Sequence, residues 1–193
     1  MTRTFKRGFL LIAGSLFCFA LAAQPKFDGG MMVHTGYLAA TLPAKNHEAS
    51  GMPFGIGGTM RFHVGSLLRV GGEGFITTLS LMDNGSYVRI GWGGAVAEMR
   101  WRVGRWHPFF GCTLGRGSAT TLLMFDGSTG DWDAEPDVVM HSESFMLADP
   151  HIGLEYALTE RIHLTSRLSY LTPLKSVDVP TGPRVFLGFV FAH

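Results

Sequence analysis

The stretch Phe54-Gly-Ile-Gly-Gly-Thr-Met-Arg-Phe-His63 decides the fold of this chain. Its even positions are apolar apart from one glycine, and its odd positions are small, polar or charged. Successive side chains of a β-strand point to opposite faces, so this period of two predicts a strand with one apolar face. A helix would repeat near every 3.6 residues. The 26 glycines of the chain also count against helices, since each costs about 1 kcal/mol relative to alanine in a helix interior.

The same period of two recurs along the chain. In residues 151–158 the even positions are apolar, and the pattern resumes after a tight connection at 159–161. We predict eight strands, at residues 28–42, 51–63, 67–81, 87–103, 107–123, 144–158, 161–172 and 183–193. Ten strands stay an alternative, because the connection 124–143 is long enough to hold another hairpin.

Two of the predicted strands break the pattern. In residues 87–103 the apolar side chains change from even to odd positions near residues 95–97. This predicts a β-bulge, or a strand that runs out of the membrane into water. Pro150 cannot donate to a strand ladder, so the strand predicted over 144–158 either begins at His151 or is kinked.

The first residues of the chain have the pattern of a secretory leader. Three basic residues precede the apolar run 9–21, and small residues precede Gln24. The run is shorter than the roughly 20 residues that a membrane-spanning helix needs. We therefore expect residues 1–23 to be a signal peptide and residues 24–193 to form one barrel domain.

Charge and cysteine content limit what the mature chain does. The sequence has 16 basic and 15 acidic residues, and the leader contains three of the basic ones, which leaves 13 against 15. No basic cluster predicts a nucleic-acid surface, so we expect no nucleic-acid partner. Cys112 would be the only cysteine left, which excludes an intramolecular disulfide.

The connections between the predicted strands alternate in length. The long ones are residues 43–50, 124–143 and 173–182, and the short ones are 64–66, 103–106 and 159–160. The hairpin turn Asp83-Asn84-Gly85 is the one short connection among the long ones. Membrane β-barrels have short periplasmic turns and longer extracellular loops. The pattern therefore favours a transmembrane barrel whose long connections lie outside the cell.

Three stretches carry a family resemblance: Pro108-Phe-Phe-Gly-Cys-Thr-Leu-Gly115, Ile152-Gly-Leu-Glu-Tyr-Ala-Leu-Thr-Glu-Arg161 and Val185-Phe-Leu-Gly-Phe-Val-Phe191. With them the chain resembles the small eight-stranded outer-membrane β-barrels of diderm bacteria, the OmpA transmembrane-domain and OmpX type. The resemblance implies an all-β, antiparallel, up-and-down barrel in outer-membrane lipid. It also implies a barrel-assembly machinery that recognises an aromatic residue at the end of the last strand, where Phe189 and Phe191 stand. It implies no chemistry, because members differ widely in function.

The polar faces of the predicted strands carry charges of both signs. The interior of an eight-stranded barrel is only wide enough to be filled by side chains, so we predict a lumen network of ion pairs rather than a diffusion pore. The predicted network residues are Arg61, Arg69, Glu73, Arg89, Glu155, His163 and Arg167, with His63, Glu98, Arg100 and His151 on the same faces. The expected interfacial aromatic girdles are Trp92, Trp101, Trp106, Phe109, Phe110, Tyr156 and Tyr170.

No catalytic constellation is evident, and we expect no enzymatic activity, cofactor or metal. A hydroxyl–histidine pair on the lipid side would be needed to modify lipid A, but His163 and Ser166 alternate onto opposite faces. His34 and His141 are placed near the outer rim, and no motif links them. The acidic connection 124–143 offers oxygen ligands that calcium prefers, without the spacing of an EF-hand loop, so a metal or a partner there stays open.

We expect a non-enzymatic integral outer-membrane protein of a diderm bacterium, whose barrel is the anchor and whose outer loops recognise an unidentified extracellular ligand. One alternative is a lipid A-modifying barrel enzyme that transfers or removes an acyl chain. Another is a soluble, secreted β-barrel that binds a small apolar ligand, which would turn Phe54, Ile56, Met60 and Phe62 inward.

Overall fold

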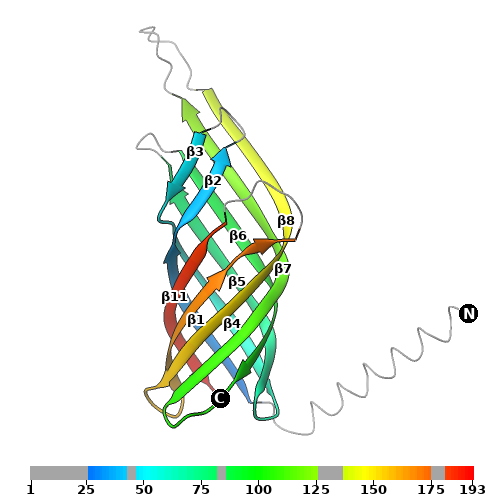
Figure 1. Ribbon diagram of the computed structural model, residues 1–193, viewed down its shortest axis with the longest axis vertical. Helices are drawn as coiled ribbons and strands as arrows, with labels where there is room; N and C mark the ends of the chain where they lie inside the picture. The colour runs from blue at the N-terminus through cyan, green and yellow to red at the C-terminus, as the bar shows by residue number, and fades with distance from the viewer. Residues whose placement is uncertain (1–25, 43–46, 82–85, 126–136, 175–180) are drawn as a thin grey trace, which may run out of the picture.

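The computed structural model describes residues 26–42, 47–81, 86–125, 137–174 and 181–193, and shows an elongated β-barrel (Figure 1). Its strands are β1 (Phe27–Gly36), β2 (Leu38–Leu42), β3 (His47–Gly51), β4 (Phe54–Val64), β5 (Leu68–Ser80), β6 (Tyr87–Arg100), β7 (Trp106–Phe125), β8 (Asp137–Ala157), β9 (Ile162–Tyr170), β10 (Thr172–Pro173) and β11 (Pro183–Ala192). None of the described segments is a helix with the length and apolarity to cross a membrane.

Eight of these strands close into a ring. The order is β8, β7, β6, β5, β4, β1, β11 and β9, and β9 pairs back onto β8. The first and last strands of the ring, β1 and β11, pair antiparallel from Asp28↔Ala192 to Gly36↔Arg184. Closure leaves no unpaired edge, which is what a sheet in lipid requires. The predicted all-β, eight-stranded antiparallel barrel is therefore confirmed. The two-stranded sheet of β2 and β3 stands apart from the ring.

The two ends of the barrel differ. At one end, called the turn end here, β4–β5, β6–β7 and β8–β9 are joined by short connections, and both chain ends of the described barrel lie there. Gly65 and Gly104 sit in two of these turns with φ of 70° and 63°, which only glycine adopts at little cost. At the opposite end, called the loop end, the β2–β3 hairpin and the extended tips of β7 and β8 project (Figure 1).

Several expectations about the connections need correction or lie outside the described residues. Residues 47–50, predicted as loop, belong to β3, and residues 137–143, also predicted as loop, belong to β8. Residues at both ends of the long acidic connection thus belong to β7 and β8, and the described ring has no ninth or tenth strand. The signal peptide (1–23), the hairpin turn (83–85) and the acidic segment 126–136 lie outside the described residues.

The apolar alternate faces of the strands point outward. Phe54, Ile56, Met60 and Phe62 are 65, 44, 54 and 41% exposed, although all four are large and apolar. A soluble barrel that binds an apolar ligand would turn these side chains inward. That alternative is therefore wrong for this chain.

The interior has an ionic half and an apolar half. On β5, Arg69 and Glu73 are buried toward the turn end, and Phe75 and Leu79 are buried toward the loop end. The buried apolar cluster consists of Met32, Leu38, Phe75, Leu79, Val88, Ile90, Trp92, Ala119, Leu123, Phe145, Leu147, Leu171 and Phe186. The sequence predicts only the ionic half of this arrangement.

Strand β6 contains no bulge, so the first of the two interpretations of its change of phase is wrong. Its pairing with β5 and with β7 is continuous from one end of the strand to the other. Val88, Trp92 and Glu98, all at even positions, are buried along its whole length. The apparent change of phase arises because the interior is apolar at the loop end, so apolar side chains of β6 point inward there and outward at the turn end.

The predicted girdle residues divide between the two faces of the sheet. On the outside, the rings of Trp106 and Tyr156 lie 4.6 Å apart at the turn end, and Tyr170 is 49% exposed. Trp92 and Phe109 are each only 4% exposed and lie inside the barrel. Their assignment to the girdles was wrong.

Pro150 lies within β8 rather than before it. It pairs with Cys112 of β7, and the strand runs through it from Asp137. On its other side β8 pairs with β10 as far as Ala148 and with β9 from His151 onward. The ladder is interrupted at the proline, so its missing N–H costs no strand hydrogen bond.

A close approach of β6 to β7 generates a stability prediction. A Cβ atom on Gly94 would lie 2.2 Å from the carbonyl oxygen of Leu114 and 2.6 Å from the Cα of Gly115. Gly91, on the outward face of the same strand, has nothing within 4 Å of such a Cβ. We expect Gly94→Ala to lower the free energy of unfolding by about 1–3 kcal/mol and Gly91→Ala to change it by less than about 0.5 kcal/mol. Urea titration of vesicle-inserted protein, followed by tryptophan fluorescence, measures both. Equal changes in unfolding free energy for the two variants would contradict a close approach of the backbones at Gly94.

Candidate functional site in the barrel interior

The interior balances its fixed charges. Among the described side chains the inward carboxylates are Asp28, Glu73, Glu98, Asp149 and Glu155, and the inward arginines are Arg61, Arg69, Arg100, Arg167 and Arg184. All but Arg100 are buried, and the Arg100 side chain is only 18% exposed. Ions removed from water need partners, and here the two signs are present in equal number.

Arg61 of β4 is the hub of the first cluster of charges. Its Nε donates to Asp28 of β1 at 2.7 Å, and its Nη1 donates to Glu98 of β6 at 2.6 Å. Its Nη2 reaches Glu155 of β8 at 3.2 Å. A guanidinium presents five N–H donors in one plane, so this single residue connects three other strands across the lumen.

Arg69 of β5 contacts the same three carboxylates. Its Nη1 lies 3.1 Å from Asp28 and 2.8 Å from Glu155, and its Nη2 lies 2.7 Å from Glu98. His63 adds a contact of 2.8 Å from its Nε2 to Asp28. Two arginines and three carboxylates thus form one cluster in which each carboxylate faces both cations.

Arg167 of β9 is the hub of a second cluster. Its Nη1 and Nη2 lie 2.6 and 3.0 Å from the two oxygens of Glu73, a bidentate pair, and its Nη2 also lies 2.7 Å from Asp149. His151 links the clusters, because its Nδ1 lies 3.0 Å from the carbonyl oxygen of Asp149 and its Nε2 lies 3.0 Å from Glu98. The two clusters form one continuous network.

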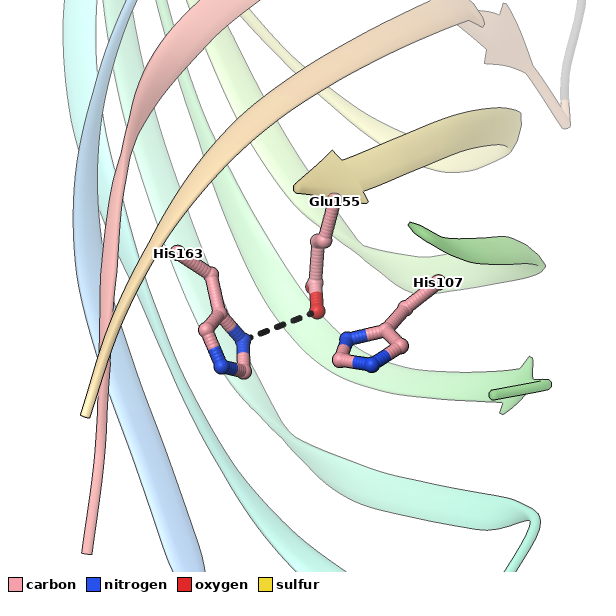
Figure 2. Close-up of side chains that lie close together, drawn as sticks. All are labelled: His107, Glu155 and His163. Carbon is pink, nitrogen blue, oxygen red and sulfur yellow. Dashed lines mark ion pairs between the residues drawn. The ribbon is translucent and has the colours of Figure 1, made fainter. Parts of the chain in front are cut away.

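Two groups in this network have the composition of a metal site. His107 of β7, Glu155 of β8 and His163 of β9 point toward one another (Figure 2), and their donor atoms lie within 4.8 Å of one another. Arg100 already faces all three. Its Nε lies 3.1 Å from Glu155 Oε2, and its Nη2 lies 3.3 Å from His163 Nδ1 and contacts His107 Nδ1. An arginine cannot shed its charge, so this donor set fits a guanidinium better than a metal ion.

The second group, Glu73, Asp149 and His151, also meets the spacing criterion. Its carboxylates are engaged by Arg167, and the hydroxyl of Thr113 donates to Glu73. These oxygens therefore serve an ion-pair network, and a metal ion would have to displace an arginine from them.

The structure brings together most of the residues predicted for the lumen network. Six of the predicted residues lie inside the barrel, in the two clusters or next to them: Arg61, Arg69, Glu73, Glu155, His163 and Arg167. Arg89 is the exception, because it is exposed between buried Val88 and Ile90, and its guanidinium lies 5.3 Å from the ring centroid of Tyr87. The prediction that Arg89 belongs to the lumen network was wrong. The interior is apolar at the loop end, so β6 turns apolar side chains inward there and Arg89 outward.

Sequence reasoning missed Asp28, Asp149 and Arg184. The treatment of Pro150 as a break hid Asp149. Arg184 could have been found, because it stands on the opposite phase to the apolar positions of the last strand. It is fully buried, its guanidinium lies 4.3 Å from the ring centroid of Trp92, and its three nitrogens have no hydrogen-bond partner in the described part of the chain.

Among the described side chains, no histidine is paired with a nucleophile. No histidine with a described side chain has a hydroxyl or thiol among its hydrogen-bond partners. His163 is buried inside the barrel and Ser166 is exposed outside it, as alternation predicts. His34, predicted near the outer rim, is buried inside, and His141 is exposed 3.1 Å from Glu143.

Two solved structures superpose on this closed ring of strands. Neisserial surface protein A superposes with a TM-score of 0.55 at 15% identity, over 86% of this chain and 95% of that chain. This chain has the fold of the small eight-stranded outer-membrane β-barrels. Ail, the attachment invasion locus protein of Yersinia pestis, in complex with the heparin analogue sucrose octasulfate, gives 0.56 at 11% identity, over 88% of this chain and 99% of that one. No protein-family model and no curated protein matches the sequence.

The hub role of Arg61 generates a second prediction. Arg61→Met leaves Asp28, Glu98 and Glu155 short of a cation in the buried interior, and removing one partner of a buried ion pair costs about 3–5 kcal/mol. Arg89→Met removes an exposed arginine and serves as the matched control, with an expected change below about 0.5 kcal/mol. Unfolding free energies in vesicles measure both. A loss at Arg61 no larger than at Arg89 would show that the three buried carboxylates do not depend on Arg61 for charge compensation.

Proposed function

We propose that this protein is a non-enzymatic integral outer-membrane protein, in which the barrel is the anchor and the loop end carries recognition. One observation supports this above all: the outside of the barrel is mostly apolar, and most of the charged strand side chains that the structure describes are inside. Met31, Phe54, Ile152 and Leu187 are 65, 65, 60 and 54% exposed. In water such a surface would promote aggregation, whereas in lipid it is the favourable solution.

The filled interior supports an anchor over a channel. Arg61, Arg69 and Arg184 are among the largest fully buried side chains, and Phe186 and Leu147 close the loop half. An eight-stranded ring leaves room only for such side chains. Solute transport through the described barrel therefore finds no support in its geometry.

Recognition is assigned to the loop end because the barrel interior and the lipid-facing surface are not accessible to a partner in the medium. The interior is filled and the apolar belt faces lipid, so a partner in the medium meets the hairpin β2–β3 and the tips of β7 and β8 (Figure 1).

Ail was crystallised with a polyanionic sulfated sugar. The sequence of residues 126–137 here contains Asp126, Asp131, Asp133, Glu135 and Asp137 and no basic residue. On charge grounds that ligand class does not transfer to this segment.

Export and assembly complete the proposal. The leader at residues 1–23 would direct the chain across the inner membrane. Phe189 and Phe191 face outward on the last strand, each 48% exposed, where an assembly machinery could bind them. Cell fractionation and unboiled gels test the location. Recovery in the soluble periplasmic extract, with no heat-modifiable band, would overturn it.

The lipid-facing orientation generates a third prediction. Leu187→Arg places a charge near the middle of the apolar belt on β11, which costs about 2–4 kcal/mol, whereas a charge near the interface costs about 0–1 kcal/mol. Thr78→Arg, outward at the loop end of β5, is the control. Unfolding free energies in vesicles should differ by that amount. If both substitutions cost the same, the surface at Leu187 does not face lipid.

The absence of a catalytic pair among the described histidines generates a fourth prediction. Lipid A extracted from cells with and without the gene should have the same acylation pattern. Mass spectrometry of the two extracts measures this. An added or missing acyl chain would contradict the non-enzymatic proposal and favour the alternative of a lipid A-modifying barrel.

A further inference from the structure

The described part of the outward barrel face carries charge at two places. Among the strand residues with described side chains, Arg89 of β6 and Arg116 of β7 are the charged residues on the outward-facing phase. Both are exposed, both are cationic, and their strands are neighbours in the ring. A random scatter of surface charge would include carboxylates and other strands. This patch, Arg89 with Arg116, is called the outward arginine pair below.

The pair lies at the loop-end border of the apolar belt. Outward side chains of β7 run from Trp106 through Phe110 and Leu114 to Arg116, ten residues further on. At about 3.4 Å per residue and a strand tilt of about 40°, Arg116 stands about 25 Å above the tryptophan, which is the height of a lipid-facing belt. The guanidinium is therefore level with headgroups of the outer leaflet.

The surroundings of the pair suit a lipid headgroup. Arg116 pairs with Gly93 of β6 on one side and with Met146 of β8 on the other, so the surface beside it is open on the β6 side, where Gly91 also has open space around it. Above Arg116 the outward residues Ser118 and Thr120 offer hydroxyls. Neither guanidinium has a carboxylate partner among the described side chains. Two cations are thus left available for anions from outside.

The spacing of the pair indicates the size of the anion. Arg89 lies four residues beyond Gly93, the register partner of Arg116, which places the two Cα atoms about 14 Å apart. A single phosphate spans far less than this. The pair fits a headgroup with negative groups at two separate points, as on a phosphorylated disaccharide.

We propose that Arg89 and Arg116 form a binding site for the headgroup of a bis-phosphorylated disaccharide lipid of the outer leaflet. The inference rests on the proposed outer-membrane location. Arg116 contacts the phosphate nearer the acyl chains, and Arg89, whose guanidinium is held over the ring of Tyr87, contacts the anionic group nearer the medium. Gly91 and Gly93, which lie outward between the levels of the two arginines, leave a shallow surface on which the sugar rings of the headgroup lie.

Binding of defined lipids to the folded, purified barrel tests the site. The probes are bis-phosphorylated lipid A, monophosphorylated lipid A and phosphatidylglycerol, each titrated into detergent-solubilised protein and read by native mass spectrometry. The variants are Arg89→Gln, Arg116→Gln and the double substitution. The control is Arg102→Gln, an exposed arginine at the turn end.

Each single substitution should weaken binding of bis-phosphorylated lipid A about five- to tenfold, the loss of one partly exposed charge-assisted contact. The double variant should bind it no better than wild type binds phosphatidylglycerol, and the control should stay within about twofold of wild type. Wild-type protein should bind monophosphorylated lipid A about as weakly as a single variant binds bis-phosphorylated lipid A. Equal binding by wild type and the double variant, or equal binding of all three lipids, would overturn the site.

The same preparations separate this inference from the proposed function. Heat modifiability on unboiled gels reports folding, and fractionation reports insertion. Variants that fold and insert like wild type, yet keep full affinity, overturn only the lipid site. Wild-type protein recovered in a soluble fraction overturns the location, and the lipid site with it.

Discussion

The pairing of β1 with β11 is the constraint on which the rest of the structure depends. It turns a sheet with two open edges into a ring in which every strand has two neighbours. In lipid no water satisfies a free edge, so the ring must close before the surface can be apolar. Closure at eight strands then fixes the interior volume. Each inward side chain must fit that volume, which explains why Gly94 and Gly115 stand where the backbones of β6 and β7 approach closely.

Within that fixed volume, the ionic network acts on strand register. Arg61 on β4 holds partners on β1, β6 and β8, and Arg167 on β9 holds partners on β5 and β8. A slip of one residue in any of these strands would turn a charge toward lipid and an apolar side chain inward. Buried ion pairs add little net stability because desolvation offsets their attraction. Their contribution here is to penalise every register but one.

The sequence predicts the strands well, because period two and short turns are local signals. It predicts the direction of the side chains less well, because alternation divides a strand into two sets without saying which set is inside. The assumption that the inside is polar or ionic holds along β4 and β9 and in the turn-end half of β5. It fails on β6, where Trp92 and Ile90 are inside and Arg89 is outside. The prediction of a strand break at Pro150 failed because it depends on which strands lie beside β8. The pairing of β8 with β10 and then with β9 leaves a gap in the ladder at Pro150, where a missing N–H costs no hydrogen bond.

The uneven interior also bears on where function resides. At the turn end the lumen is ionic, and toward the loop end it is closed by aromatic and aliphatic side chains, so no described path connects the two sides of the membrane. Interior charge among the described side chains is matched, with five arginines against five carboxylates, and therefore presents little field to the outside. The outward face, by contrast, carries two unmatched cations, and both stand near the interface, where the cost of exposing charge to lipid falls toward zero. Among the strand residues with described side chains, Arg89 and Arg116 are the charged ones on the outward phase, and both stand at the level where the proposed anionic headgroups are concentrated.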